Sequence, residues 1–290
     1  TIYPLALDAL GLGKLSVGPP YFETVFLPLM APALFLMGVG PLARWKKAEV
    51  PELAARLRWA LGVSVAAALV VPFAMGRFSA LVGFGVWLAV WIIASAATSL
   101  VDRVKHAGGG AGIANRLRGT PRSYYGMLLA HVGVAVFVIG VTLVKGYEAE
   151  KDARMMPGDT LELAGYAFRF GGVDEVKGPN YIAARATLFV TKEGRKVTTL
   201  YPERRIYQVQ ESAMTEASID NGVFRHLYAA LSEPVGPDAW IVRVHYKPFV
   251  AWIWGGCVLM ALGGLLAATD RRYRSSAREP RPAAYAAATR

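Results

Sequence analysis

Residues 125–144 read YGMLLAHVGVAVFVIGVTLV, and this stretch determines the class of the fold. It is apolar on every side of a helix, and His131 is the only readily ionised side chain within it. About 20 apolar residues are enough for a helix to cross a hydrocarbon core of roughly 30 Å. Four further stretches have the same character: Tyr21–Leu42, Leu57–Gly76, Ala80–Val101 and Pro248–Thr269. The sequence therefore predicts an α-helical polytopic membrane protein with five transmembrane helices.

The composition agrees with a membrane protein and excludes several other classes. Of the 290 residues, 54% are hydrophobic and 18% are charged, which rules out a disordered chain and a coiled coil. The single cysteine, Cys257, cannot form an internal disulfide or a cysteine-rich metal site. Residue 1 is Thr and no signal peptide follows it, so we expect a piece of a longer protein or a product of a split gene.

The distribution of Lys and Arg predicts the orientation of the five helices. Outside residues 145–247 the chain has 18 Lys and Arg, and 16 of them lie in three segments: Ala43–Arg56 with Arg58, Asp102–Tyr124, and the tail from Asp270. Basic segments next to transmembrane helices stay in the cytoplasm. The segment 1–20, the turn at Arg77 and the long stretch Lys145–Lys247 are then expected on the outer side. We expect the polar tail, residues 275–290, to be disordered.

The stretch Lys145–Lys247 predicts a small all-β outer domain inserted between residues 21–144, which hold the first four helices, and residues 248–274, which hold the fifth helix and its basic end. Its 14 Lys and Arg balance 14 Asp and Glu, so the net charge of +11 belongs to the membrane part and does not indicate nucleic-acid binding. Five runs are rich in β-branched and aromatic residues: Thr160–Leu163, Ala167–Val173, Ile182–Thr191, Lys196–Tyr201 and Trp240–Tyr246.

Two local features of this domain add detail. Thr191–Arg195 predicts a hairpin turn with Gly194 at a position of positive φ. Val223–Leu231 fits either a strand or a short helix.

His131 is the strongest candidate for a functional residue. An ionisable side chain inside a membrane span is costly and indicates function. It lies six residues, or about 9 Å along a helix, beyond Tyr125, in the half of the span expected near the cytoplasm. Gly126, Gly133 and Gly140 repeat every seven residues and predict a smooth face for a neighbouring helix, with His131 pointing away from it. Three roles stay open for its imidazole: an axial ligand of haem iron, a proton relay, or a structural hydrogen bond.

The remaining candidates are weaker. His106 is expected in a solvated loop, His226 at the domain surface and His245 near the outer membrane surface, and their spacing does not fit a zinc site. Trp87 and Trp91 share a helix face and could edge a planar cofactor, but packing is the more common use of such a pair. We interpret Cys257 as a packing residue and Gly108–Gly112 as a flexible loop, because it lacks the pattern of a phosphate-binding loop. Gly11–Ser16 resembles a shortened phosphate-binding loop only superficially, and the expected topology places it on the outer side, where no nucleotide is available.

Four stretches together resemble the C-terminal part of the CcmF family, the large subunit of the bacterial cytochrome c haem lyase. They read DALGLGKLSVGPPYF at residues 8–22, SYYGMLLAHVGVA at residues 123–135, LYAAL at residues 227–231, and KPFVAWIW at residues 247–254, where the last helix ends in DRRYR at residues 270–274.

The resemblance implies a bacterial inner-membrane protein with a periplasmic β-domain that takes part in cytochrome c maturation. In the family, a His in an Ala-His-Val-Gly setting ligates a permanent transmembrane b-type haem, and His131 is the matching residue here. The resemblance also implies three partners: a second haem lyase subunit, a haem-carrier chaperone and apocytochrome c. The family's Trp-rich haem-binding segment and the second ligand of the haem are not in this chain, so we expect them in an N-terminal half of the same protein.

The sequence thus predicts a membrane subunit that helps to position and reduce haem for thioether attachment to apocytochrome c. It identifies no catalytic residue in this chain. The alternative is a non-catalytic assembly subunit, anchored by its helices, whose outer β-domain docks partner proteins. A haem spectrum of the complete protein with and without His131 separates the two hypotheses.

Overall fold

A computed structural model describes residues 2–11, 13, 18, 22–43, 50–106, 112–208 and 212–270. The chain divides into two compact units, and each is described by itself. The first unit holds most of the helices, and the second holds the strands together with parts of three helices. The division passes through two of these helices at residues 135/136 and 258/259, and it also assigns Ser79–Val82, at the start of a third helix, to the second unit. The tail expected to be disordered, residues 275–290, lies outside the described residues.

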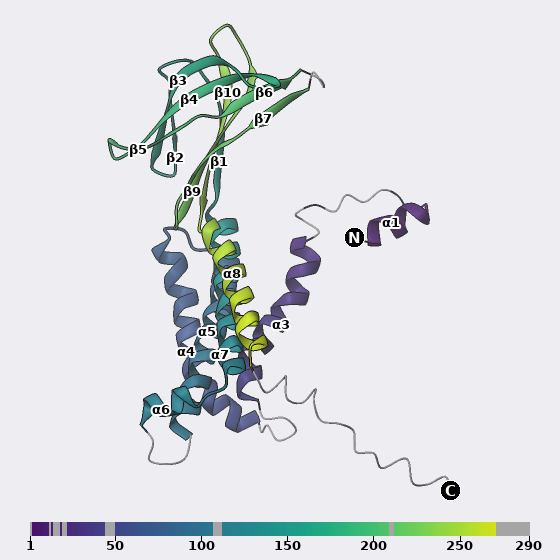
Figure 1. The fold of residues 1–290 in the computed structure, drawn as a ribbon, viewed down its shortest axis with the longest axis vertical. Helices are drawn as coiled ribbons and strands as arrows, with labels where there is room; N and C mark the ends of the chain where they lie inside the picture. Colours follow the sequence, from purple (N-terminus) through teal and green to yellow (C-terminus); the bar gives the residue numbers. More distant parts are fainter. Residues whose placement is uncertain are drawn as a thin grey trace. The chain divides into compact units, whose positions relative to one another are not determined.

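The helices follow the apolar stretches of the sequence (Figure 1). In chain order they are α1 (Ile2–Ala9), η1 (Phe22–Phe26), α3 (Leu27–Val39), η2 (Gly40–Leu42), α4 (Val50–Ala74), α5 (Ala80–His106), α6 (Ile113–Arg118), α7 (Arg122–Tyr147) and α8 (Val250–Ala268).

Five helical segments of the described chain are long and apolar enough to cross a membrane. They are Thr24–Leu42, Val50–Ala74, Ala80–Lys105, Arg122–Tyr147 and Val250–Ala268. The five expected spans coincide with them except at the ends, where α4 begins seven residues before Leu57 because Glu52 and Arg56 pair within its first turns. Pro248 lies in a strand, and Phe249 has a φ of 57°, so the last helix begins at Val250.

Helix α5 is the most buried of the five spans. Half of its most apolar 18-residue stretch is buried, against 11–22% of the corresponding stretches in the other four spans. The ring of Phe35 on α3 stacks on Trp91, with centroids 5.2 Å apart. A Cβ added to Gly83 would lie 3.0 Å from the Ala68 carbonyl of α4. These contacts explain why α5 carries small and aromatic residues but no charge before Asp102.

Helices α7 and α8 approach each other through glycine. A Cβ added to Gly126 would lie 2.5 Å from the carbonyl oxygen of Gly263 and 2.6 Å from the nitrogen of Ala267. One added to Gly140 would lie 2.8 Å from the nitrogen of Ile253. The face predicted from the seven-residue glycine repeat therefore packs on α8 at both of these positions, where only glycine lets the two backbones come so close.

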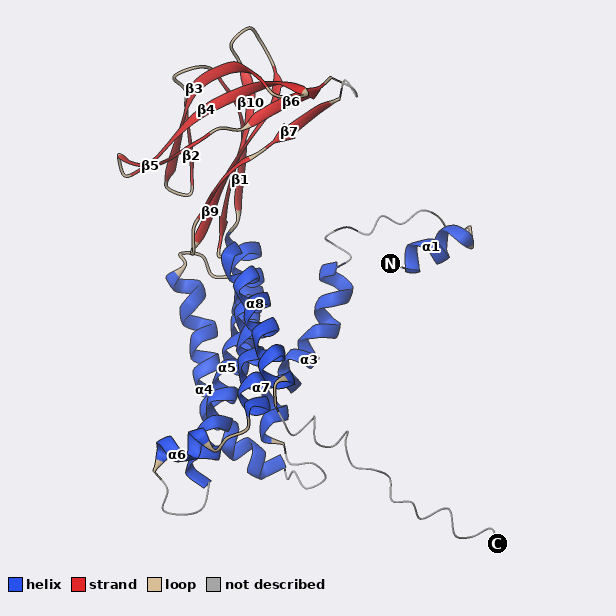
Figure 2. Ribbon diagram, viewed as in Figure 1, coloured by secondary structure: helices blue, strands red, loops and turns tan. Residues whose placement is uncertain are grey.

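The second unit contains ten strands in two antiparallel sheets (Figure 2). They are β1 (Ala149–Met155), β2 (Thr160–Leu163), β3 (Tyr166–Lys177), β4 (Tyr181–Lys192), β5 (Arg195–Leu200), β6 (Glu203–Tyr207), β7 (Ala213–Glu216), β8 (Ser218–Asn221), β9 (Arg225–Pro234) and β10 (Trp240–Pro248). One sheet has the order β1-β10-β9-β8, and the other has the order β2-β3-β4-β6-β7 with β5 paired to β4.

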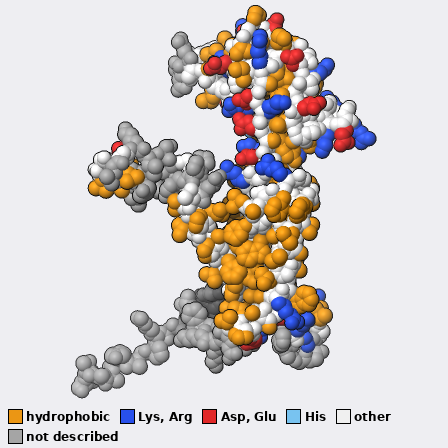
Figure 3. All heavy atoms as spheres, turned by 180° about the vertical axis from the view of Figure 1, so that it is seen from behind, with side chains coloured by type: hydrophobic (Ala, Val, Ile, Leu, Met, Phe, Trp, Pro, Cys, Tyr) orange, Lys and Arg blue, Asp and Glu red, His pale blue; other side chains and the backbone are white. Residues whose placement is uncertain are grey.

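The core of this domain consists of alternate residues from both sheets, as period-2 side chains require. Phe168, Leu188, Leu227 and Val244 are fully buried in one cluster with ten other buried residues. Charged side chains lie on the outer surface of the domain (Figure 3), and strands such as β4 and β10 alternate between buried and more exposed residues. The predicted fold class, five membrane helices with an inserted small all-β domain, is confirmed in these features.

The sequence predicted the strands with apolar alternation and missed the others. All five predicted runs correspond to strands β2, β3, β4, β5 and β10, and the undecided stretch Val223–Leu231 contributes to a strand, β9. The hairpin at Gly194 has φ values of 50° at Glu193 and 74° at Gly194, as in a type I′ turn. The missed strands β1, β6, β7 and β8 are short or rich in charge, so their pattern resembles that of loops.

Candidate functional site

His131 lies within α7, nine residues after its first residue, in one of the five membrane-length spans. Its Nδ1 donates a hydrogen bond to the carbonyl oxygen of Met127, one turn earlier, at 2.7 Å. Because a carbonyl oxygen only accepts, Nδ1 must carry the proton, and Nε2 of the neutral ring keeps its lone pair. A hydrogen bond at one ring nitrogen that leaves the other as the donor atom is the usual arrangement of a metal-ligating histidine.

The direction of His131 on the helix follows from the contacts of its neighbours. Gly126 and Ala130 meet Gly263 of α8, with 2.6 Å between an added Gly263 Cβ and the Ala130 nitrogen. His131 is five residues after Gly126 and therefore points about 140° away from it around the helix axis. The imidazole accordingly lies away from the α7–α8 contact, as the sequence predicted. Ala135, one turn further on, is fully buried.

The end of α7 that precedes His131 is held by three contacts with other helices and their connections. The Ser123 backbone nitrogen donates to the Asp270 carboxylate at 3.0 Å. The hydroxyls of Tyr124 and Ser99 are 2.8 Å apart, and the guanidinium of Arg103 lies 4.5 Å from the centre of the Tyr124 ring. These contacts fix both the rotation and the height of the helix that carries His131.

Trp87 and Trp91 pack against another helix. Phe35 stacks on both indoles, with centroids 5.8 Å from Trp87 and 5.2 Å from Trp91. Trp91 Nε1 also donates to the Phe35 carbonyl at 2.9 Å. Packing, the more common use of such a pair, therefore accounts for the contacts of both indoles with α3.

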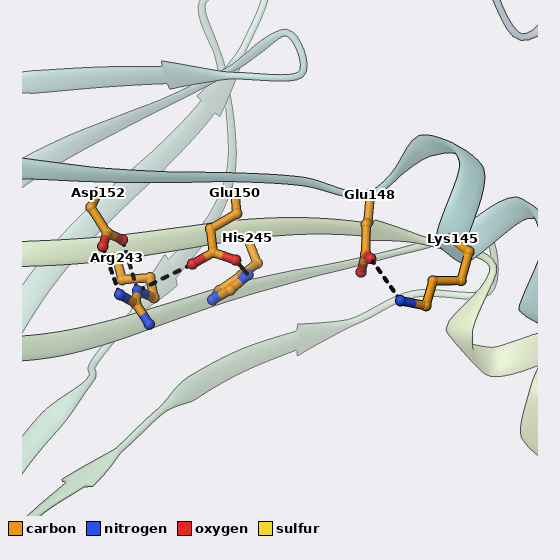
Figure 4. Close-up of polar contacts among 6 residues, drawn as sticks. All are labelled: Lys145, Glu148, Glu150, Asp152, Arg243 and His245. Carbon is orange, nitrogen blue, oxygen red and sulfur yellow. Dashed lines mark hydrogen bonds and ion pairs between the residues drawn. The ribbon is translucent and has the colours of Figure 1, made fainter. Parts of the chain in front are cut away.

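His245 lies on the exposed face of the strand pair β1–β10 (Figure 4). Its Nδ1 is 3.4 Å from Glu150, and its ring lies edge-on to Tyr228 with centroids 4.8 Å apart. Arg243, two residues earlier, pairs with Asp152 at 2.7 Å and with Glu150 at 3.3 Å. Burial lowers the pKa of His245, although the neighbouring Glu150 carboxylate opposes this. No sequence pattern indicates these contacts between β1 and β10. They depend on the register of the two strands, which brings together residues 91 positions apart in the sequence.

The other candidate residues lie on elements other than α7 or outside the described residues. His226 is on β9, and burial followed by the neighbouring Arg225 lowers its pKa. Cys257 is a half-buried free thiol in α8. His106 is the last residue of α5, and most of Gly11–Ser16 and Gly108–Gly112 falls outside the described residues. Within the described ranges, no three His, Cys, Asp or Glu side chains are grouped so that they could hold a metal ion.

Fold and site together define a multi-pass membrane protein with an inserted β-sandwich and one histidine placed inside an apolar helix. Residues 146–248 match the family described as the CcmF C-terminal beta-sandwich. The match covers the β-domain alone, so whole-chain comparisons are needed for the helices.

Those comparisons extend the resemblance to nearly the whole chain. A cytochrome c-type biogenesis protein CcmF of Pseudomonas aeruginosa is 48% identical over 274 residues, and that of Escherichia coli K12 is 41% identical over 275 residues. Each alignment covers 94% of this chain and 41% of the relative. A solved structure named cytochrome c heme lyase CcmF matches 92% of this chain and 42% of its own, with a TM-score of 0.71 and 25% identity. The resemblance to the C-terminal part of CcmF is confirmed, and this chain spans about two-fifths of the length of these relatives.

Proposed function

We propose that this chain is a haem-handling part of the machinery that attaches haem to apocytochrome c. The relatives and the matched structure bear the names of a cytochrome c biogenesis protein and a heme lyase. His131 is the only histidine in the described membrane-length spans of the chain, and its imidazole is suited to haem chemistry. Its part in the process is to help position and reduce the haem, while thioether formation uses residues outside this chain.

The observation that carries the proposal is the hydrogen bond from His131 Nδ1 to the Met127 carbonyl. In the neutral ring this bond leaves Nε2 with the lone pair, and His131 lies on the side of α7 away from the packed α7–α8 contact. A neutral imidazole in apolar surroundings is a suitable axial ligand for haem iron. When bound, a b-type haem would supply one-electron redox chemistry at this point in the membrane. The second axial ligand would come from the N-terminal half of the protein.

The location and partners of the chain follow from the same proposal. The chain would lie in the bacterial inner membrane, with the β-domain in the periplasm and the basic connections in the cytoplasm. Its partners would be a second haem lyase subunit, a haem-carrier chaperone and apocytochrome c.

Labelling of Glu193→Cys by an impermeant reagent from the periplasm, with Ser275→Cys protected, is the expected result. The reverse labelling pattern would contradict the orientation.

The test of the function is His131→Ala in the full-length protein. We expect loss of the low-spin b-type haem spectrum and impaired cytochrome c maturation, because the iron loses an axial ligand. Normal haem per protein with impaired maturation would instead favour the assembly subunit, whose β-domain docks partners.

A further inference from the structure

The hairpin between β8 and β9 presents two large apolar side chains at its tip. Val223 is 64% exposed and Phe224 is 61% exposed. Phe224 contacts two other rings, Phe249 at 5.9 Å and Trp252 at 6.2 Å between centroids, and these two rings are 5.3 Å apart. The tip therefore belongs to a cluster of three aromatic residues, and most of the surface of Phe224 and Val223 stays uncovered by the described residues.

This cluster lies where the chain enters the membrane span. Trp252 is in the first turn of α8, which begins at Val250 directly after Phe249. A transmembrane helix enters the hydrocarbon at its first apolar turn, and Trp and aromatic rings gather at that level of a bilayer. Because Phe224 touches both Phe249 and Trp252, the hairpin tip must lie at the same level as the start of α8.

The backbone holds the hairpin in this position. The Phe249 nitrogen donates to the Phe224 carbonyl at 3.0 Å, which joins the tip directly to the residue before α8. A Cβ added to Gly222 would lie 2.8 Å from the Arg225 carbonyl, so the tight turn requires glycine there. Arg225 is in turn paired with Asp220 across the hairpin. These contacts hold the exposed apolar tip in a defined position in the fold.

Three other hairpins of the same domain provide an internal comparison. The β4–β5 hairpin turns at Glu193 and Gly194, the β3–β4 hairpin at Gly178–Asn180, and the β2–β3 hairpin at Ala164 and Gly165. These tips have the small and polar residues usual in turns that face water. Of these four tips, the β8–β9 tip, which contacts the start of α8, is the one that carries two large apolar residues, Val223 and Phe224.

We propose that Val223 and Phe224 insert into the lipid interface beside α8 and anchor the β-domain to the membrane surface. The occupant of their exposed sides is lipid, at the boundary of headgroups and acyl chains. The inference rests on the membrane span of α8 and is independent of haem binding. It gives the β-domain a third point of attachment besides its two chain connections to α7 and α8.

The test places a nitroxide spin label at Val223→Cys in the full-length protein in lipid nanodiscs, with native cysteines, including Cys257, replaced by Ser. The matched control is Glu193→Cys at the polar β4–β5 tip. Oxygen, which concentrates in the bilayer, and a water-soluble nickel chelate serve as the two relaxation probes. We expect the ratio of oxygen to nickel accessibility to be several-fold higher at position 223 than at position 193. Phe224→Cys provides a second labelled variant with the same expectation.

Two outcomes would overturn the proposal. Nickel accessibility at position 223 equal to that at position 193 would show that the tip lies in water. Shielding from both probes would show that another protein segment covers it.

Discussion

The helices and the β-sandwich satisfy their polar groups in opposite ways. In the helices, several polar side chains bond to backbone carbonyls: His131 to Met127, Thr98 to Ala94 and Trp91 to Phe35. On the sandwich, charged side chains bond to one another across strands, as Arg243 does to Asp152. The difference follows from the surroundings, because a lipid core offers no water to a charge whereas the face of a sheet does.

The two regions are also sensitive to different kinds of substitution. The stability of the sandwich depends on large side chains from both sheets that pack together in its core. The helices depend on the absence of side chains where α7 and α8 meet. Removing atoms should therefore damage the sandwich, and adding atoms should damage the helix contact.

Phe168→Ala should have the strongest effect on stability. Phe168 is fully buried in the sandwich core, so its truncation leaves a cavity and costs about 3–5 kcal/mol. Thermal unfolding of the protein in detergent, followed by near-ultraviolet circular dichroism, measures the loss. Val197→Ala, at a position 36% exposed on β5, is the control and should change the midpoint much less. Equal shifts for both variants would contradict the assignment of the core.

An intermediate effect is expected from Gly126→Ala. The new methyl would meet the backbone of Gly263 and Ala267, forcing α7 and α8 apart at a cost of about 1–3 kcal/mol. Gly264→Ala on α8 is the matched control, since a Cβ there meets nothing within 4 Å. Resistance to unfolding by sodium dodecyl sulfate compares the two proteins. Equal resistance would show that the close contact is absent in solution.

A weaker effect is expected from Glu203→Gln in the sandwich. Burial opposes the ionisation of Glu203, but hydrogen bonds from Arg205 and Arg185, at 2.8 and 2.6 Å, outweigh it and lower the pKa. A lowered carboxyl pKa contributes stability above the ordinary value of about 4.3, and this is lost as pH falls through the folded-state pKa.

Near pH 7 the Glu203→Gln protein should therefore unfold roughly 4–8 °C lower, which corresponds to about 1 kcal/mol in a domain of this size. The difference from wild type should shrink as the pH falls below about 4. A difference that stays constant down to this acidic range would show that the charge of Glu203 is not responsible. Both arginines are partly exposed, so added salt should also reduce the difference.

The same contrast explains which parts of the fold could be predicted from sequence. A membrane span needs about 20 apolar residues in a row, and this signal is strong enough to find all five helices. Strand β1 reads AEKDARM, with charges on its exposed face at an edge of its sheet, and such a pattern does not differ from that of a loop. The strands that were predicted are mainly those with the apolar residues of the core.

The candidate site likewise has features that could be predicted from the sequence and features that could not. His131 could be identified as the candidate because it is an ionisable residue inside an apolar span, and its direction away from the glycine face follows from helical periodicity. The hydrogen bond to Met127 depends on a side-chain rotamer, and the cluster of Phe224, Phe249 and Trp252 depends on a contact between a hairpin and a helix. Neither contact produces a periodic pattern of residues, so neither could be predicted from the sequence.

The haem content of His131→Gly in the full-length protein, measured by absorbance with and without added imidazole, bears most closely on the proposed role of His131. Removing the side chain leaves a space that free imidazole can fill as a ligand. We predict loss of the low-spin haem spectrum relative to protein, and its return when imidazole is added. A His131→Gly protein that accumulates normally and keeps its full low-spin haem without imidazole would contradict the assignment of His131 as an axial ligand.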